Sequence, residues 1–464
     1  MIPGELPPDH CAAAEPESTD SQTFTPSSET SETPSSHFQL VFQLRKDALR
    51  FQMFIAISFF FVYLYMIASC VMFFSSLYPV SGPQNPSQNR TSAVDFLLVT
   101  SHICAIDITS ALFVLCGFFA AYTYDNVPAA DHADLRKLIA VYALIDVWLA
   151  GLLTLLVGSV FHLVRHSFRA VDVALTTLES MFCLRVFDVH QDSARWHSMN
   201  PSAWPVLCLF WATLLTPFTM QGNERLRRCH PTAGLVIQWV NACGPILIIS
   251  LFALVHDNSN VFYMNASNVC YRVLEFNLGI CMYSLMSMRP ELFWRLAGVA
   301  SSTCPYVMAT FVLVWWAQLG AAVQQQDTQH TSCIRMYHFS PCIEMHHGFL
   351  MRGCILGVVL VCRVLMSTED EMHRLATCVV FDAHALPAAM SAVLLTWPAC
   401  YLVHLLLEVN FGLQLVHDNA ALLTLVVPHI ALTLAMLWDT SWKQHAFVAV
   451  DSWLDRAASR LRPL

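Results

Sequence analysis

Long apolar segments recur along the whole chain, and they decide what it can fold into. A helix needs about 20 mostly apolar residues to cross a bilayer, and it satisfies its own backbone hydrogen bonds there. Only 12% of the 464 residues are charged, against about a quarter in soluble domains. The ninth segment contains Pro387 and Pro398, so it forms either one helix or two shorter pieces. The sequence therefore predicts an all-α membrane bundle of about ten transmembrane helices, near residues 52–78, 96–122, 138–163, 204–220, 232–255, 269–286, 297–322, 349–366, 383–407 and 420–438.

The two ends of the chain differ from this apolar middle. Residues 1–38 are rich in Ser, Thr, Pro and Glu and contain no Lys or Arg, so we expect a disordered cytosolic tail rather than a signal peptide. Residues 39–440 form the predicted transmembrane domain. Residues 441–464 place apolar side chains on one helical face and arginines on another, which predicts a cytosolic amphipathic helix on the membrane surface. The net charge of -9 comes without a broad basic surface, so no nucleic-acid partner is expected.

The connecting segments predict that both termini are cytosolic. Basic residues concentrate in the connections at 222–230 and 287–295 and in the C-terminal tail, which the positive-inside rule assigns to the cytosol. The glycosylation sequons at Asn89 and Asn265 then fall on the lumenal or external side. Charge and sequons thus agree on a single orientation.

Two other segments belong to this outer side. The polar loop that contains Cys333 and Cys342 would lie in an oxidising lumen, where the two cysteines are predicted to form a disulfide. The connection at 164–202 would also be lumenal, although it carries four arginines. It is long enough for the charge rule to weaken, and residues 171–184 within it are interpreted as an interfacial helix.

Polar residues inside the predicted spans are the candidate functional residues, because a charged or imidazole side chain is costly in a membrane. Arg272 and Glu275 open the sixth span three positions apart, and His404 and Glu408 close the ninth span four positions apart. Residues at these spacings lie on the same face of a helix. Each pair is therefore expected to interact.

The remaining intramembrane polar groups allow a structural and a functional interpretation. His102 and Asp107 lie a turn and a half apart in the second span and are candidates for a shared hydrogen bond. Asp146 and His429 are isolated, and hydrogen bonding between helices is the favoured role for both. The histidines of the large outer loop are interpreted as part of a polar loop, so no metal site is expected. Asp382 and His384 stand at the start of the ninth span.

Four short motifs resemble, in order, landmarks of the membrane-bound acyltransferase family 3, whose members acylate glycans and lipids. DALR at 47–50 is similar to the family's Asp-Gly-Leu-Arg at the cytosolic mouth of the first span. LFVLCGFF at 112–119 is similar to its Phe-Phe-Val-Leu-Ser-Gly-Phe motif. RVLEFNLG at 272–279 is similar to Arg-x-x-Glu-Phe-x-x-Gly, and YLVH at 401–404 to Tyr-Leu-x-His. The resemblance covers about residues 40–440.

This resemblance implies an O-acyltransferase that transfers an acyl group, such as acetyl, from acyl-CoA to a hydroxyl of a glycan or lipid on the lumenal or external side. Acyl-CoA would be a co-substrate, with no cofactor bound permanently. The donor-binding cluster would be Arg45, Lys46, Asp47 and Arg50, in which basic side chains hold the CoA phosphates by charge-assisted hydrogen bonds.

The same resemblance suggests roles for the intramembrane groups. His102 or His404 would be the general base toward the acceptor hydroxyl. Arg50, Arg272 and Glu275 would orient the donor or build the core network. Catalytic candidates are thus spread over three of the predicted spans and the residues just before the first span.

The chain also departs from the family pattern. Family members usually carry a His eleven positions after the Arg of Asp-Gly-Leu-Arg, about 16 Å deeper along the first span, and here that position is Phe61. Counted from Lys137, Ala140 occupies the second position of the family's Arg-x-x-Arg. Cys116 replaces the Ser of Ser-Gly-Phe, and the Trp-Ser-Leu-x-x-Glu landmark has no match. These departures leave either an enzyme with relocated catalytic groups or an inactive member of the family.

A catalytically inactive member would act as a transporter, receptor or scaffold. The chain shows no inverted repeat and no pair of broken helices, which argues against the common transporter plans. Ten spans argue against a seven-helix receptor. The sequence favours the acyltransferase, in the endoplasmic reticulum, the Golgi or the plasma membrane.

Overall fold

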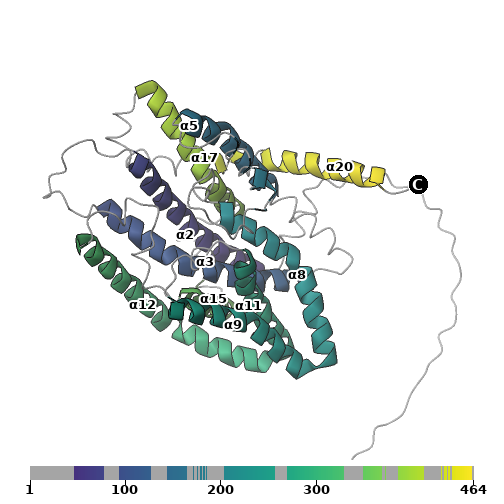
Figure 1. Cartoon of the computed structure of the whole chain (residues 1–464). Helices are drawn as coiled ribbons and strands as arrows, with labels where there is room; N and C mark the ends of the chain where they lie inside the picture. Colours follow the sequence, from purple (N-terminus) through teal and green to yellow (C-terminus); the bar gives the residue numbers. More distant parts are fainter. Residues whose placement is uncertain are drawn as a thin grey trace, which may run out of the picture. The chain divides into compact units, whose positions relative to one another are not determined.

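A computed structural model describes residues 46–77, 93–126, 144–164, 203–256, 269–328, 349–367, 385–411 and 442–461, with single positions at 171–184, 371 and 430–438. These described residues all belong to one compact unit, 43–464. They are helical almost throughout, as expected (Figure 1). The helices are α2 (Lys46–Leu77), α3 (Ala93–Asn126), a helical stretch 144–153 continued by η3 (Thr154–Gly158) and α5 (Ser159–Val164), α8 (Trp204–Cys229), α9 (Pro231–His256), α11 (Val269–Met288), α12 (Pro290–Thr328), α15 (Phe349–Met366), α17 (Ala385–Phe411) and α20 (Lys443–Leu461).

Five of the described helical segments are long and apolar enough to cross a membrane, namely Asp107–Asn126, Leu144–Phe161, Pro231–Ile248, Pro290–Ala317 and Ala388–Leu406. The segment in α12 is only 17% buried, and the one in α9 only 22%. Apolar helices that expose most of their length are unfavourable in water, so a lipid bilayer is the environment they indicate. The count of about ten spans stays a prediction, because only these five described segments are long and apolar enough, and α2 contributes only the shorter apolar stretch Phe51–Leu64.

Helix α3 is the centre of the described bundle, and it packs against α2, α8, α11, α12 and α15. Its closest approach is to α11, where glycines line both sides of the contact. A Cβ atom added at Gly117 would overlap the backbone of Phe276, and one added at Gly279 would overlap the backbone of Val114. The absence of both side chains therefore lets the two backbones touch.

Glycines also bring α15 against α3. A side chain at Gly353 would overlap Ser110, and a Cβ at Gly357 would lie 2.7 Å from the Cβ of Val114. The two glycines are four positions apart, the spacing of the small-xxx-small contact of membrane helices. Helix α3 is thus held between two glycine-lined neighbours.

The directions of the helices follow from which residues meet. Ser110 of α3 contacts Arg272 of α11, and Asp125 contacts Tyr283 further along both helices, so α3 and α11 run parallel. Asp107 contacts Arg352, and Val114 faces Gly357, so α15 runs the same way.

Helix α12 runs the other way, because Trp315 contacts Asp107 while Phe311 packs with Ala111. The connection between α8 and α9 is a tight antiparallel turn in which Gln238 donates to the carbonyl oxygen of Asn223 at 3.2 Å. This alternation is what successive membrane crossings from α3 to α15 would produce.

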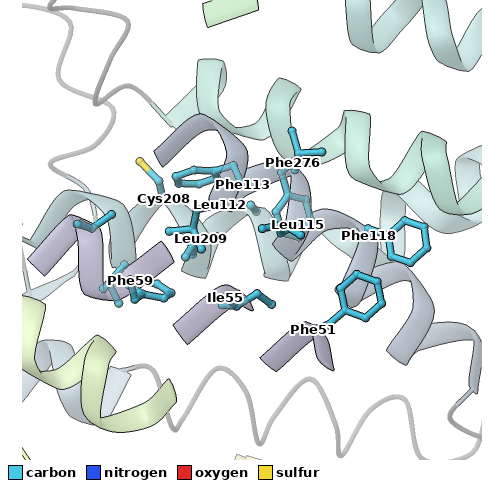
Figure 2. Close-up of a cluster of buried hydrophobic side chains, with 14 of the residues drawn as sticks. Phe51, Ile55, Phe59, Leu112, Phe113, Leu115, Phe118, Cys208, Leu209 and Phe276 are labelled. Atoms are coloured by element: carbon cyan, nitrogen blue, oxygen red, sulfur yellow. The ribbon is translucent and has the colours of Figure 1, made fainter. Parts of the chain in front are cut away.

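The apolar core joins α2, α3, α8 and α11. Its ring contacts include Phe51 of α2 stacked on Phe118 of α3, with 5.1 Å between the centroids. This contact places the start of α2 beside the second half of α3. Figure 2 shows the labelled core residues Phe51, Ile55, Phe59, Leu112, Phe113, Leu115, Phe118, Cys208, Leu209 and Phe276.

The ninth apolar segment forms the single helix α17, with Pro398 inside it, so the alternative of two shorter pieces is wrong. Proline also lies inside α8, α9 and α12. Membrane helices tolerate proline because neighbouring groups satisfy the freed carbonyls. The predicted interfacial segment is helical at Val171, Leu175 and Leu178, and all three side chains are exposed.

Candidate functional site

The centre of the candidate site is an ion pair inside α11. Arg272 and Glu275 meet on one face of the helix, as their spacing predicts, with Arg272 Nη1 donating to Glu275 Oε2 at 2.6 Å. The same nitrogen donates to Ser110 Oγ of α3 at 2.9 Å. The side chains of Arg272 and Glu275 are 1% and 0% exposed. The pair therefore lies entirely within protein, at the contact between two of the motif-bearing helices.

Aromatic rings surround the guanidinium of Arg272. Its Cζ atom lies 5.5 Å from the ring centroid of Phe113 and 5.2 Å from that of Trp204. Cation–π attraction adds to the ion pair at these distances. Three helices, α3, α8 and α11, thus converge on one buried charge.

A second charged group lies one turn away on α3. Arg352 of α15 approaches Asp107 with both Nε and Nη2, at 3.2 Å and 2.8 Å. Trp315 of α12 donates its indole N–H to Asp107 Oδ2 at 2.8 Å. Asp107 and Ser110 are three residues apart, so one face of α3 presents both polar contacts. Asp107 is paired across helices.

His102 belongs to the same helix, α3, but its side chain lies outside the described part of the structure. The predicted hydrogen bond between His102 and Asp107 is therefore untested. Asp107 instead contacts Arg352 and Trp315, which the sequence did not predict as its partners.

His404 lies in a different part of the bundle. Its side chain is 0% exposed. Tyr401, three residues earlier in α17, belongs to a small apolar cluster with Phe161, with 5.1 Å between the two ring centroids. Helix α17 packs chiefly against α2 and η3, whereas Arg272 and Glu275 face α3. The structure thus places His404 and the Arg272–Glu275 pair in different parts of the bundle. The side chain of Glu408 lies outside the described residues.

The predicted donor-side cluster coincides with the start of α2. The helix begins at Lys46, and Asp47 and Arg50 lie in its first turns, although their side chains are not described. Because Phe51 stacks on Phe118, this end of α2 lies about 12 Å along the axis of α3 from Ser110.

Several other predicted residues fall outside the described part of the chain. These are Arg45, the sequon residues Asn89 and Asn265, the cysteines Cys333 and Cys342, and also Ala140, Asp382, His384 and His429.

Phe61 occupies the position where the resemblance expects a histidine. Its side chain is 43% exposed, and the neighbouring Phe60 is 47% exposed, whereas Phe59 and Val62 are buried in the bundle. Phe61 therefore points away from the core of the described bundle. A histidine at this position would not reach Arg272 or Glu275 without a rotation of α2.

Asp146 is not isolated, contrary to the expectation from sequence, but its contacts between helices agree with the role that the sequence favoured. Lys443 Nζ lies 2.5 Å from Asp146 Oδ2, and Trp438 donates its indole N–H to Oδ1 at 2.8 Å. Lys443 is the first residue of α20 and is 1% exposed. The pair attaches the start of the amphipathic helix to the helix that contains Asp146.

Sequence reasoning missed Arg352, Trp315 and Lys443 as partners of the buried acids. Arg352 stands near the start of its apolar segment, where an arginine is ordinarily assigned to the membrane surface. The spacing of Gly353 and Gly357 was the available signal, because it predicts a close helix contact on the face next to Arg352.

Among the described residues, no three or more His, Cys, Asp and Glu side chains are grouped to hold a metal ion. Comparisons with protein-family models, with curated proteins and with solved structures find no match for this chain.

Proposed function

We propose that this protein is a divergent membrane O-acyltransferase, which transfers an acyl group from acyl-CoA to a hydroxyl of a glycan or lipid on the other side of the bilayer. The observation that carries the proposal is the contact between two motif-bearing helices. LFVLCGFF on α3 and RVLEFNLG on α11 are far apart in the sequence, yet Gly117 of one lies against Phe276 of the other. The polar residues of the second motif, Arg272 and Glu275, form the buried pair beside this contact.

The arrangement suits a path from one face of the membrane toward the other. The basic cluster at 45–50 stands at the proposed cytosolic mouth, and the Arg272–Glu275 pair lies deeper, near Ser110. Glu275 Oε1 has no hydrogen-bond partner among the described residues, and its side chain is fully buried. In the proposed mechanism the general base, His102 or His404, removes the acceptor's hydroxyl proton. The oxygen then attacks the thioester carbonyl, and CoA leaves as the thiol.

The finer features of the architecture belong to the same proposal. They are about ten spans, both termini in the cytosol and residence in the endoplasmic reticulum, the Golgi or the plasma membrane. The parallel directions of α3, α11 and α15 support an alternating arrangement of this kind.

The alternative is a catalytically inactive member that acts as a transporter, receptor or scaffold. Two observations favour it. Phe61 points out of the described bundle, and the imidazole of His404 is wholly buried. A base in that position reaches a substrate only if α17 or its neighbours move.

Acyl transfer from labelled acetyl-CoA in membranes that contain the full chain tests the proposal. We expect transfer to a component of a broad glycan and lipid panel, with a loss of about 100-fold or more when the true base, His102 or His404, is replaced by alanine. Arg363→Gln is the matched control, because its ion pair with Glu371 is on the surface. If the wild-type protein transfers nothing to the whole panel, the inactive alternative is favoured. Full activity in both histidine variants would exclude them as the base.

A further inference from the structure

A cavity of about 450 Å³ lies where the C-terminal ends of α3, α8 and α11 meet the start of α9. Its volume is within the range of small-molecule sites, about 300–1,000 Å³. Tyr283 of its lining is eleven residues beyond Arg272, which is about 16 Å along α11. The cavity is therefore separate from the buried ion pair.

The lining carries two carboxylates and two arginines, and one ion pair between them is formed among the described residues. Glu224 is paired with Arg228, and Asp125 accepts a hydrogen bond from the Tyr283 hydroxyl at 2.6 Å. Arg227 donates its Nε–H to the carbonyl oxygen of Asn223 at 3.3 Å. No carboxylate of the described residues forms an ion pair with Arg227, so its terminal N–H groups remain available there for an anion.

The chemistry of the lining fits an organic phosphate. A guanidinium presents two parallel N–H groups that match the oxygens of a phosphate. Arg228, one residue on, engages Glu224 through Nη2 and keeps further donors. The rings of Tyr124 and Tyr283 form an adjoining wall against which an organic group can pack.

A simpler role for the arginines is to offset the negative end of the α8 dipole, since Arg227 and Arg228 lie in its last turn. That role accounts for the charge but not for the hollow formed by four helices around it. That role also requires no ligand, so anion binding that depends on Arg227 separates the two roles.

We propose that this cavity binds an organic phosphate, with Arg227 as its main anchor and Arg228 as the second. The proposal goes beyond acyl transfer and does not depend on it. The phosphate belongs either to a soluble molecule such as CoA or to the headgroup of a phospholipid, because the cavity lies at the ends of membrane helices.

Equilibrium binding to the purified full chain in phosphatidylcholine nanodiscs tests the site, with labelled CoA as one probe and a labelled short-chain phosphatidylinositol phosphate as the other. We expect one probe to bind in a salt-sensitive manner. Arg227→Gln should weaken that binding about tenfold, as expected for the loss of one charge-assisted contact. Arg225→Gln is the matched control, because Arg225 lies in the same exposed part of α8 but does not line the cavity, and it should bind as the wild type does.

A second variant keeps both arginines and fills the space. Ser287 lines the cavity from α11 and is exposed, so Ser287→Trp should fold and should abolish binding. Binding of CoA identifies the soluble source, and binding of the lipid probe identifies the headgroup. The proposal is overturned if neither probe binds, or if Ser287→Trp binds like the wild type. It is also overturned if Arg225→Gln weakens binding as much as Arg227→Gln does.

Discussion

Arg272 shows what a single residue contributes to this bundle. A buried guanidinium is tolerated only when its charge is compensated and its donors are used. Here Glu275 supplies the charge, Ser110 accepts a hydrogen bond, and two aromatic rings cover the guanidinium. The side chain is therefore a point where α3, α8 and α11 depend on one another.

The first prediction concerns this ion pair. Glu275→Gln removes the compensating charge and leaves Arg272 buried and unpaired, which should lower the free energy of unfolding by about 3–5 kcal/mol. The measurement is the unfolding temperature of the solubilised protein by fluorescence-detected gel filtration, which should fall clearly below that of the wild type.

Arg363→Gln is the matched control for the surface case. Its pair with Glu371 is 37% and 45% exposed, so its loss should change stability by no more than about 1 kcal/mol. The double variant Arg272→Met/Glu275→Leu should regain part of the loss, because it leaves no buried charge. Equal unfolding temperatures for Glu275→Gln and Arg363→Gln would contradict the prediction.

The residues that sequence reasoning placed correctly are those whose partners are local. The Arg272–Glu275 pair could be predicted because residues three positions apart share a helix face. Asp146 and Lys443 are separated by 297 residues, and Asp107 and Arg352 by 245. No helical spacing connects such pairs, so their contacts appear only when the helices are packed.

At the scale of elements, glycine decides how closely the helices approach. The four glycines on the faces of α3, α11 and α15 allow contacts that a methyl group would prevent. Close approach lengthens the surface over which two helices touch, and dispersion contacts provide much of the association energy between helices in a membrane. The polar contacts of Ser110 and Asp107 lie on these same interfaces.

The second prediction tests that role. Gly117→Ala and Gly279→Ala should each lower the unfolding temperature, because the added Cβ would overlap the backbone of the facing helix. Gly298→Ala is the matched control in α12, since nothing lies within 4 Å of its Cβ. The control should be neutral or should gain up to about 1 kcal/mol from helix propensity. A loss at Gly298 as large as that at Gly117 would show that the contact is not the cause.

Helix positions were easier to predict than helix faces. The apolar segments correspond to α2, α3, residues 144–164, α8, α9, α11, α12, α15 and α17, because length and hydropathy are properties of the segment itself. The outward direction of Phe61 was not predictable, since most of α2 is apolar on all sides and has no marked polar face. Which side chains of α2 are buried therefore depends on how the neighbouring helices pack against it.

At the scale of the whole molecule, the directions of the described helices agree with the alternating crossings that the sequence predicts. The parallel pair α3 and α11 requires an odd number of crossings between them, and three helical segments lie there: 144–164, α8 and α9. If every one of these helices crosses the membrane, the arginine-rich end of α8 and the start of α2 lie on the same side. This is the side that the positive-inside rule assigns to the cytosol.

The last prediction tests this orientation from both sides of the membrane. Cys229 is an exposed cysteine at the end of α8, so a membrane-impermeant maleimide should modify it in cells whose plasma membrane alone is permeabilised. Cys229→Ser removes that modification and serves as the control. The sequons should be glycosylated, because the predicted topology assigns them to the opposite side, and removal of glycans should shift the wild-type protein but not the Asn89→Gln/Asn265→Gln variant on a gel. Modification of Cys229 only after the internal membranes are opened would reverse the orientation. It would also move the basic start of α2 to the lumenal side, where no cytosolic acyl-CoA could reach it.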